Sequence, residues 1–111
     1  MNTNDTAIEF VLPWVAVGKY AENLTNELQR EVTERHVLWR RAVRPLAQRV
    51  DCDDVLFEVE GAANTYAVVH LTWTGEREDD PQCPDTIFFG SIDEWVRNGM
   101  MADHREFIGS E

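Results

Sequence analysis

One glutamate and one histidine are the residues of this chain best placed to carry chemistry together. They belong to two alternating segments, and a register with Val59 opposite Ala67 gives these segments one shared apolar face. In that register Glu58 and His70 project from the other face and lie diagonally within reach of one another. An imidazole titrates at about pH 6.5, so a neighbouring carboxylate lets it act as a general acid or base. The alternative interpretation is an ordinary solvated sheet face.

The two cysteines match neither a reactive thiol nor a metal site. Cys52 stands in the acidic run 51–54, whose carboxylates disfavour the thiolate and should raise its pKa, so we expect a poor nucleophile. Cys83 lies between prolines in a second acidic segment. Zinc sites need closely spaced Cys/His pairs, whereas the histidines here are singletons far apart in sequence: His36, His70 and His104. We therefore predict no metal, no cofactor and reduced thiols, with one Cys52–Cys83 disulfide as the alternative.

A proline-containing segment, 75–85, concentrates carboxylates next to an aromatic residue. The residues that we expect to contact a partner are Glu76, Glu78, Asp79 and Asp80, with Trp73 or Trp39 as an exposed aromatic. Acidic side chains steer a basic partner toward the surface, and an aromatic anchor supplies much of the affinity. The alternative interpretation is a solvated charge cluster that keeps a small protein in solution.

The charge of the whole chain is strongly negative. Its 111 residues carry a net charge of −11, concentrated in residues 51–111. The summed field repels a polyanion, so nucleic-acid binding is not expected. The arginines of residues 30–49 either pair with carboxylates of the same chain or form a basic patch for an acidic partner.

The hydrophobic pattern predicts no segment that enters or crosses a membrane. The longest apolar runs are four or five residues, and the N-terminus lacks the basic flank and apolar stretch of an export signal. We expect a cytoplasmic protein.

The periodicity predicts helices and strands in alternation. Residues 21–35 form a helix whose apolar stripe is Ala21, Leu24, Leu28 and Val32, with Glu27 and Glu31 on the charged outer face and a Glu31–Arg35 pair. Residues 91–100 form a second helix, because Ser91 and Glu94 have the spacing of a capping box, and Gly99 weakens its end. The predicted strands are 36–43, 55–60, 65–74 and 86–89, and residues 8–17, which contain Pro13, form an edge strand or an extended entry arm. Pro45 is expected to begin a short helical turn between the predicted strands 36–43 and 55–60.

Assembled, these segments predict an α+β domain with an antiparallel sheet of about four strands. The hairpin 55–60/65–74 is central, and both helices pack on one face. The chain 1–111 is one domain, with loose termini at 1–7 and 109–111; residues 101–111 are held only by Phe107 and Ile108.

The blocks Asp-Asp-Val-Leu-Phe-Glu-Val (53–59) and Tyr-Ala-Val-Val-His-Leu-Thr-Trp (66–73) resemble those of a family of short, uncharacterised bacterial proteins. The resemblance covers the last two-thirds of the chain. It implies a bacterial origin and a stand-alone domain, and it brings no activity and no site.

Size, acidity and the absence of a catalytic motif favour a non-enzymatic interaction protein. Its sharpest version is an immunity-type or inhibitor-like binder of a basic protein. The alternative is a small enzyme that uses His70 with Glu58 as an acid/base pair. The chain is expected to be a monomer, or a homodimer joined through an edge strand such as 8–17.

Overall fold

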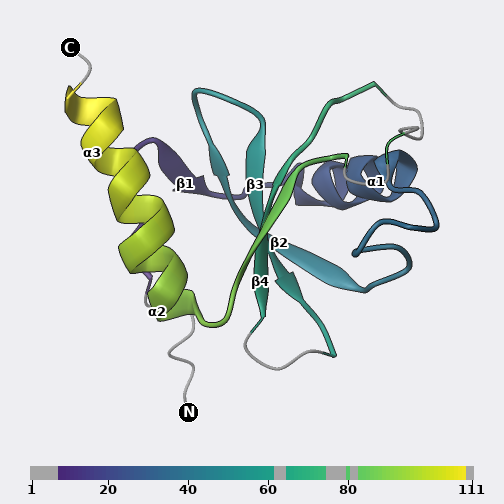
Figure 1. Cartoon of the computed structure of the whole chain (residues 1–111). Helices are drawn as coiled ribbons and strands as arrows, with labels where there is room; N and C mark the ends of the chain where they lie inside the picture. Colours follow the sequence, from purple (N-terminus) through teal and green to yellow (C-terminus); the bar gives the residue numbers. More distant parts are fainter. Residues whose placement is uncertain (1–7, 62–64, 75–79, 81–82, 110–111) are drawn as a thin grey trace.

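The computed structural model describes residues 8–61, 65–74, 80 and 83–109. These residues form one antiparallel sheet with a helical region on each side (Figure 1). In chain order the elements are β1 (Trp14–Ala16), α1 (Ala21–Glu31), β2 (Val43–Arg49), β3 (Asp54–Val59), β4 (Tyr66–His70), β5 (Thr86–Phe89), α2 (Ile92–Trp95), the π-helix η2 (Val96–Met100) and α3 (Met101–Gly109). No helix among the described residues combines the length and the apolar character that a membrane span requires.

The sheet is a meander of five strands in the order β1-β2-β3-β4-β5. The α+β class and the antiparallel sheet are therefore confirmed, with five strands in place of about four. The prediction that both helices pack on one face is wrong. The cluster of Val55, Phe57 and Val59 from β3 packs with α1, whereas Leu56 packs with Trp95 and Met100 of the C-terminal helical region. Strand β3 thus buries both of its faces.

The hairpin of β3 and β4 has the predicted faces but a different register. Val59 lies opposite Thr65, and Phe57 lies opposite Ala67. The strands are thus shifted by two residues from the predicted pairing. A shift of two keeps every side chain on its face, because side chains alternate with a period of two. The apolar face toward α1 is accordingly the predicted one, except that β4 ends at His70 and Trp73 lies beyond it with a positive φ of 58°.

Two predictions about the residues around the start of β2 are wrong. Residues 36–42 form turns rather than a strand, and Pro45 lies inside β2 rather than at the start of a helical turn. Strand β1 pairs only with residues 47–49, so Pro45 has no ladder partner on that side, and the β2–β3 register shifts between Pro45 and Ala47. A sheet tolerates proline at an unpaired edge and at a bulge. The predicted strand 8–17 is present as an edge strand, reduced to β1.

The C-terminal helical region is longer than predicted. Ser91 Oγ accepts the backbone N–H of Glu94 at 3.0 Å, as the capping spacing predicts, and Glu94 Oε1 accepts the N–H of Gly90 at 2.8 Å. The helix then continues through Gly99 to Gly109, so the expectation of a loose tail from residue 101 is wrong. Gly99 is required by packing: a Cβ there would lie 2.8 Å from Cδ1 of the buried Trp95. Residues 1–7 and 110–111, expected to be loose, lie outside the described residues.

Candidate functional site

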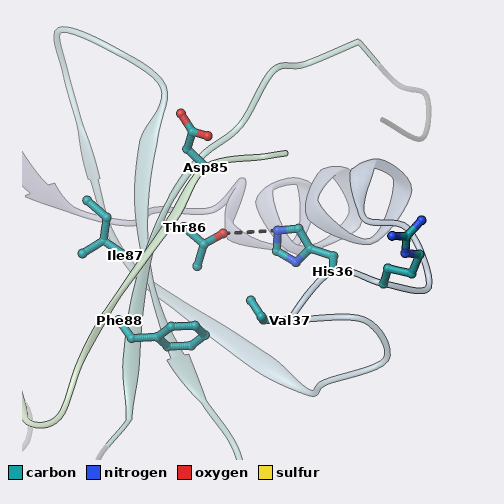
Figure 2. A pocket seen from close by; sticks show the side chains of 7 residues that line it. His36, Val37, Asp85, Thr86, Ile87 and Phe88 are labelled. Atoms are coloured by element: carbon teal, nitrogen blue, oxygen red, sulfur yellow. Dashed lines mark hydrogen bonds between the residues drawn. The ribbon is translucent and has the colours of Figure 1, made fainter. Parts of the chain in front are cut away.

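An open groove runs beside β5, the last strand of the sheet. It has a volume of about 780 Å³ and lies between β5 and the turn that follows α1 (Figure 2). Three apolar side chains line it while remaining exposed to solvent: Val37 (59%), Ile87 (62%) and Phe88 (43%). Large apolar side chains that cluster on a surface commonly mark a binding site.

The backbone of β5 presents hydrogen-bonding groups to this open side. The N–H of His70 donates to Asp85 O at 2.9 Å, and Val68 lies directly opposite Ile87. Because hydrogen-bonded pairs alternate in an antiparallel ladder, Ile87 bonds to β4, whereas the N–H and C=O groups of Thr86 and Phe88 point away from the sheet. An exposed edge of this kind can accept an added strand.

His36 fixes the wall of the groove opposite β5. Its ring is buried, and its Nδ1 accepts the backbone N–H of Leu38 at 3.0 Å. The ring proton therefore resides on Nε2, which donates to Pro84 O at 3.0 Å. Nε2 also lies 3.3 Å from Thr86 Oγ1, the contact drawn in Figure 2. This histidine ties the turn after α1 to the start of β5.

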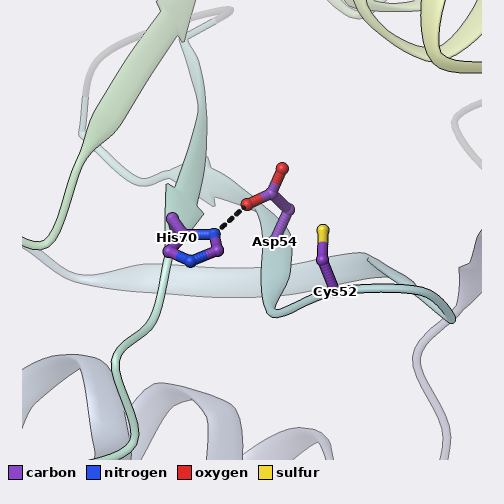
Figure 3. A group of neighbouring side chains, drawn as sticks. All are labelled: Cys52, Asp54 and His70. Atoms are coloured by element: carbon purple, nitrogen blue, oxygen red, sulfur yellow. Dashed lines mark hydrogen bonds and ion pairs between the residues drawn. The ribbon is translucent and has the colours of Figure 1, made fainter.

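A second group of polar side chains lies where β3 begins and β4 ends. Asp54 is directly opposite His70, and the carboxylate Oδ1 lies 2.7 Å from the imidazole Nδ1 (Figure 3). The flanking pairs carry the backbone hydrogen bonds, as the bond from Leu71 N–H to Asp53 O shows. Asp54 and His70 are therefore a non-hydrogen-bonded pair, the type in which side chains approach most closely. Cys52, in the preceding turn, completes the group: one ligand atom from each residue lies within 4.8 Å of the others.

Arg49 balances part of the negative charge around this group. It makes a bidentate contact with Asp51, with both N···O distances at 2.8 Å, and its Nη1 lies 3.5 Å from Asp103 and 3.8 Å from Asp54. The hydrogen bond to Asp51 raises the pKa of the Arg49 guanidinium above its ordinary value, and the same contact lowers the pKa of Asp51. Arg49 therefore stays charged and bound chiefly to Asp51.

The thiol of Cys52 is not an activated nucleophile. Partial burial raises its pKa, and the charges of Asp54 and Asp51 raise it further, against the opposing effects of a backbone N–H and Arg49. The sequence predicted this direction from the carboxylates alone. No disulfide joins Cys52 and Cys83 in the structure, so the alternative of a bridge between them is not formed.

Two buried glutamates lie on α1, where the sequence predicted a charged outer face. Glu31 accepts the backbone N–H groups of Thr72 and Trp73, at 3.0 Å and 2.8 Å, in place of the expected pairing with Arg35. Burial raises the pKa of Glu31 to about 7, and a hydrogen bond with the Glu27 side chain contributes to the rise. Glu27 in turn contacts Arg30 at 3.2 Å. Glu31 thus holds the chain beyond β4 against α1.

The structure does not bring the predicted acid/base pair together. Glu58, near the end of β3, lies opposite Tyr66 and pairs with Arg44. His70 pairs instead with Asp54, which begins β3. Asp54 and Glu58 are four residues apart on an extended strand, a separation of about 13 Å. Glu58 and His70 share a face of the sheet without being neighbours.

The predicted partner-contacting residues lie in different places. Trp73 is exposed (45%) and lines a smaller groove next to Cys52, whereas Trp39 is half-buried and packs against the core beside α1. Asp80 is exposed. The remaining members of the predicted acidic surface lie outside the described residues: Glu76, Glu78 and Asp79.

Sequence reasoning missed the pairing of Asp54 with His70, and it missed the exposed β5 edge. The first could have been found from the hairpin, since the correct register places these two residues opposite each other. The second had a weaker signal, the run Thr86–Phe89, whose alternate side chains point to opposite faces at the margin of the sheet.

Comparison with known protein families, with curated proteins and with solved structures finds no match to this chain. The resemblance to short bacterial proteins stays a prediction.

Proposed function

We propose that this protein is a non-enzymatic interaction domain that binds an extended, basic segment of another protein along the open edge of β5. The observation that carries the proposal is the edge itself: outward N–H and C=O groups of Thr86 and Phe88 beside exposed Ile87 and Val37. Strand addition uses such backbone groups for affinity and the neighbouring side-chain pockets for specificity.

The charge of the chain indicates which kind of partner fits this edge. The net charge is −11, and the segment that leads into β5 carries Glu76, Glu78, Asp79, Asp80 and Asp85 against one arginine. The groove itself is lined by one basic and one acidic side chain, Arg35 and Asp85, so the attraction comes from the net charge of the chain. A second copy of the chain carries the same net charge and is repelled, whereas a basic segment is attracted. Within this proposal the protein is a bacterial, cytoplasmic, monomeric binder of the immunity or inhibitor type.

The size of the edge sets the expected strength of binding. Strand β5 has four residues, so the contact falls below a standard interface of about 800 Å² per partner. We expect dissociation constants on the order of 1–100 μM, which suit titration by NMR better than stringent capture.

The test begins with selection of random extended peptides on the tag-free protein. The expected ligands alternate apolar residues with lysine or arginine, and they shift the NMR signals of residues 35–37 and 85–88. Binding should weaken between about 50 mM and 300 mM salt, because exposed charges are screened.

Two pairs of variants then separate the edge from general surface stickiness. Ile87→Asp should lose binding at least tenfold, whereas Ile108→Asp, at another exposed apolar residue in α3, should not. Phe88→Pro removes an outward N–H without breaking the ladder to β4, so it should bind more weakly than Phe88→Ala. Peptides that bind Ile87→Asp as well as wild type, or an equal effect of both Phe88 variants, would show that the edge is not the site.

A further inference from the structure

The structure assigns Cys52, Asp54 and His70 a role that the interaction proposal does not use. We propose that these three side chains bind one divalent transition-metal ion of the zinc type and leave one coordination position open. The three residues come from one turn and two strands, and the antiparallel pairing of Asp54 with His70 is what brings them together.

The chemistry of the donor set selects the class of metal. A thiolate, an imidazole and a carboxylate are the ligands that Zn²⁺ takes in proteins, and three protein ligands with a free fourth position are typical of an open zinc site. Ca²⁺ and Mg²⁺ prefer all-oxygen ligands, so a thiol and an imidazole together disfavour them. On binding, the metal replaces the proton of the Cys52 thiol, which is released to solvent.

The spacing of the ligand atoms is close to what a tetrahedral ion needs. They lie within 4.8 Å of one another, and bond lengths of about 2.0–2.3 Å place neighbouring ligands of a tetrahedral site about 3.3–3.7 Å apart. The group must therefore contract by about 1 Å, and the short contact between Asp54 and His70 must open by a similar amount. Both changes are side-chain rotations, because the side chain of His70 is half-exposed and Cys52 is exposed.

The surrounding charges favour a cation at this point. Asp51, Asp53 and Asp103 lie around the three ligands, and Arg49 is the nearby cation. Arg49 is held by its bidentate contact with Asp51, so it reaches Asp54 only at 3.8 Å and leaves the pairing of Asp54 with His70 intact. The guanidinium thus does not occupy the space between the ligands.

A groove adjoins the proposed site and has room for a further ligand. It has a volume of about 380 Å³, and Cys52 and Asp54 form part of its wall together with Leu24, Val55 and Trp73. A water molecule or a small anionic group on the metal would occupy the open coordination position from this side.

The experiment titrates tag-free protein with Co²⁺ and then displaces it with Zn²⁺. Co²⁺ bound to a thiolate gives a near-ultraviolet charge-transfer absorption, which reports the sulfur ligand directly. We expect one equivalent per chain for the wild type, loss of this absorption in Cys52→Ser, and at least tenfold weaker Zn²⁺ binding by calorimetry in Cys52→Ser, Asp54→Asn and His70→Gln.

Matched controls use the residues of the same type elsewhere in the chain. Cys83→Ser and His104→Gln should retain the absorption and the affinity, and far-ultraviolet circular dichroism checks that every variant is folded. The proposal is overturned if the wild type shows no cobalt–sulfur absorption, or if the absorption depends on Cys83. It is equally overturned if several weak equivalents bind alike to wild type and Cys52→Ser, as an acidic surface alone would produce.

Discussion

Replacing Glu31 by glutamine should abolish a pH dependence of stability that the wild-type protein carries between pH 4.5 and about 7. Glu31 is fully buried, and its pKa is raised from 4.5 to about 7, first by burial and then by the hydrogen bond with Glu27. In this interval the folded protein holds a proton that the unfolded chain has released. Unfolding therefore releases a proton, so the contribution of Glu31 to stability is greatest at and below pH 4.5 and falls as the pH rises toward 7.

The magnitude follows from the size of the pKa difference. Each unit corresponds to about 1.36 kcal/mol, so the loss of unfolding free energy across the interval approaches about 3 kcal/mol. Glutamine imitates the protonated acid. Its amide oxygen can accept the N–H groups of Thr72 and Trp73, both of which reach Oε2 of Glu31, and its NH₂ group can donate to Glu27. Glu31→Gln should equal the wild type near pH 4.5 and exceed it at pH 8.

The assay is urea unfolding followed by far-ultraviolet circular dichroism from about pH 4.5 to pH 8. Other groups titrate in this range, so the informative quantity is the difference between the curves of the wild type and the variant. Glu34→Gln, at an exposed residue just beyond α1, is the control and should run parallel to the wild type. Glu31→Ala should be less stable at every pH, because the two N–H groups lose their acceptor at about 1–3 kcal/mol each. Parallel curves for the wild type and Glu31→Gln would show that Glu31 is not the source of the pH dependence.

Two further substitutions test the packing and the surface charge by the same unfolding assay. Gly99→Ala should destabilise the protein by about 1–2 kcal/mol, because the clash with Trp95 exceeds the gain of about 1 kcal/mol in helix propensity. The control is Gly109→Ala, whose added Cβ meets no atom within 4 Å and should leave stability unchanged or raise it. Equal effects of the two substitutions would contradict a packing role for Gly99. Arg44→Ala should lower the free energy of unfolding by no more than about 1 kcal/mol, because the contact between Arg44 and Glu58 is exposed. Leu56→Ala, in the core, should lower it by about 2–5 kcal/mol. A larger loss for Arg44→Ala would argue against a solvent-screened ion pair.

The fold could be predicted where the signal is local. The alternation of residues 55–59 and 67–71 identified the hairpin and its buried face, and the Ser91/Glu94 spacing identified the start of the C-terminal helix. The register could not be predicted in the same way. A shift of one residue moves polar side chains onto the apolar face and can be rejected, whereas a shift of two residues leaves every side chain on its face.

Errors in the fold arose where a residue's role depends on a distant neighbour. Taken alone, Pro45 indicates the start of a helix. In the structure β1 pairs only with residues 47–49, so Pro45 has no neighbour on that side and can lie within β2. Taken alone, Gly99 indicates the end of a helix. In the structure it lies within the helical region, where the side chain of Trp95 leaves no room for a Cβ atom. Glu27 and Glu31 indicate an outer face, yet both are buried, and the chain beyond β4 supplies N–H donors to Glu31.

The candidate site was misjudged for the same physical reason. Metal-site reasoning from sequence relies on close spacing along the chain, which suits turns and single helices. An antiparallel pair brings together residues that are 16 positions apart, and only the register reveals which ones. The two-residue error that moved Glu58 next to His70 in the prediction also concealed Asp54.

The two proposed sites meet at one residue of β4. The side chain of His70 contacts Asp54 in the proposed metal site, and its backbone N–H donates to Asp85 O where β5 begins. A metal ion that fixes His70 would therefore also fix the start of the strand to which the partner segment is proposed to add. The variants still separate the two ideas, because Cys52 does not line the groove beside β5 and Ile87 is not one of the three proposed ligands. Partner affinity should accordingly be measured on metal-free and zinc-loaded protein, and a difference that Cys52→Ser abolishes would show that the sites are coupled.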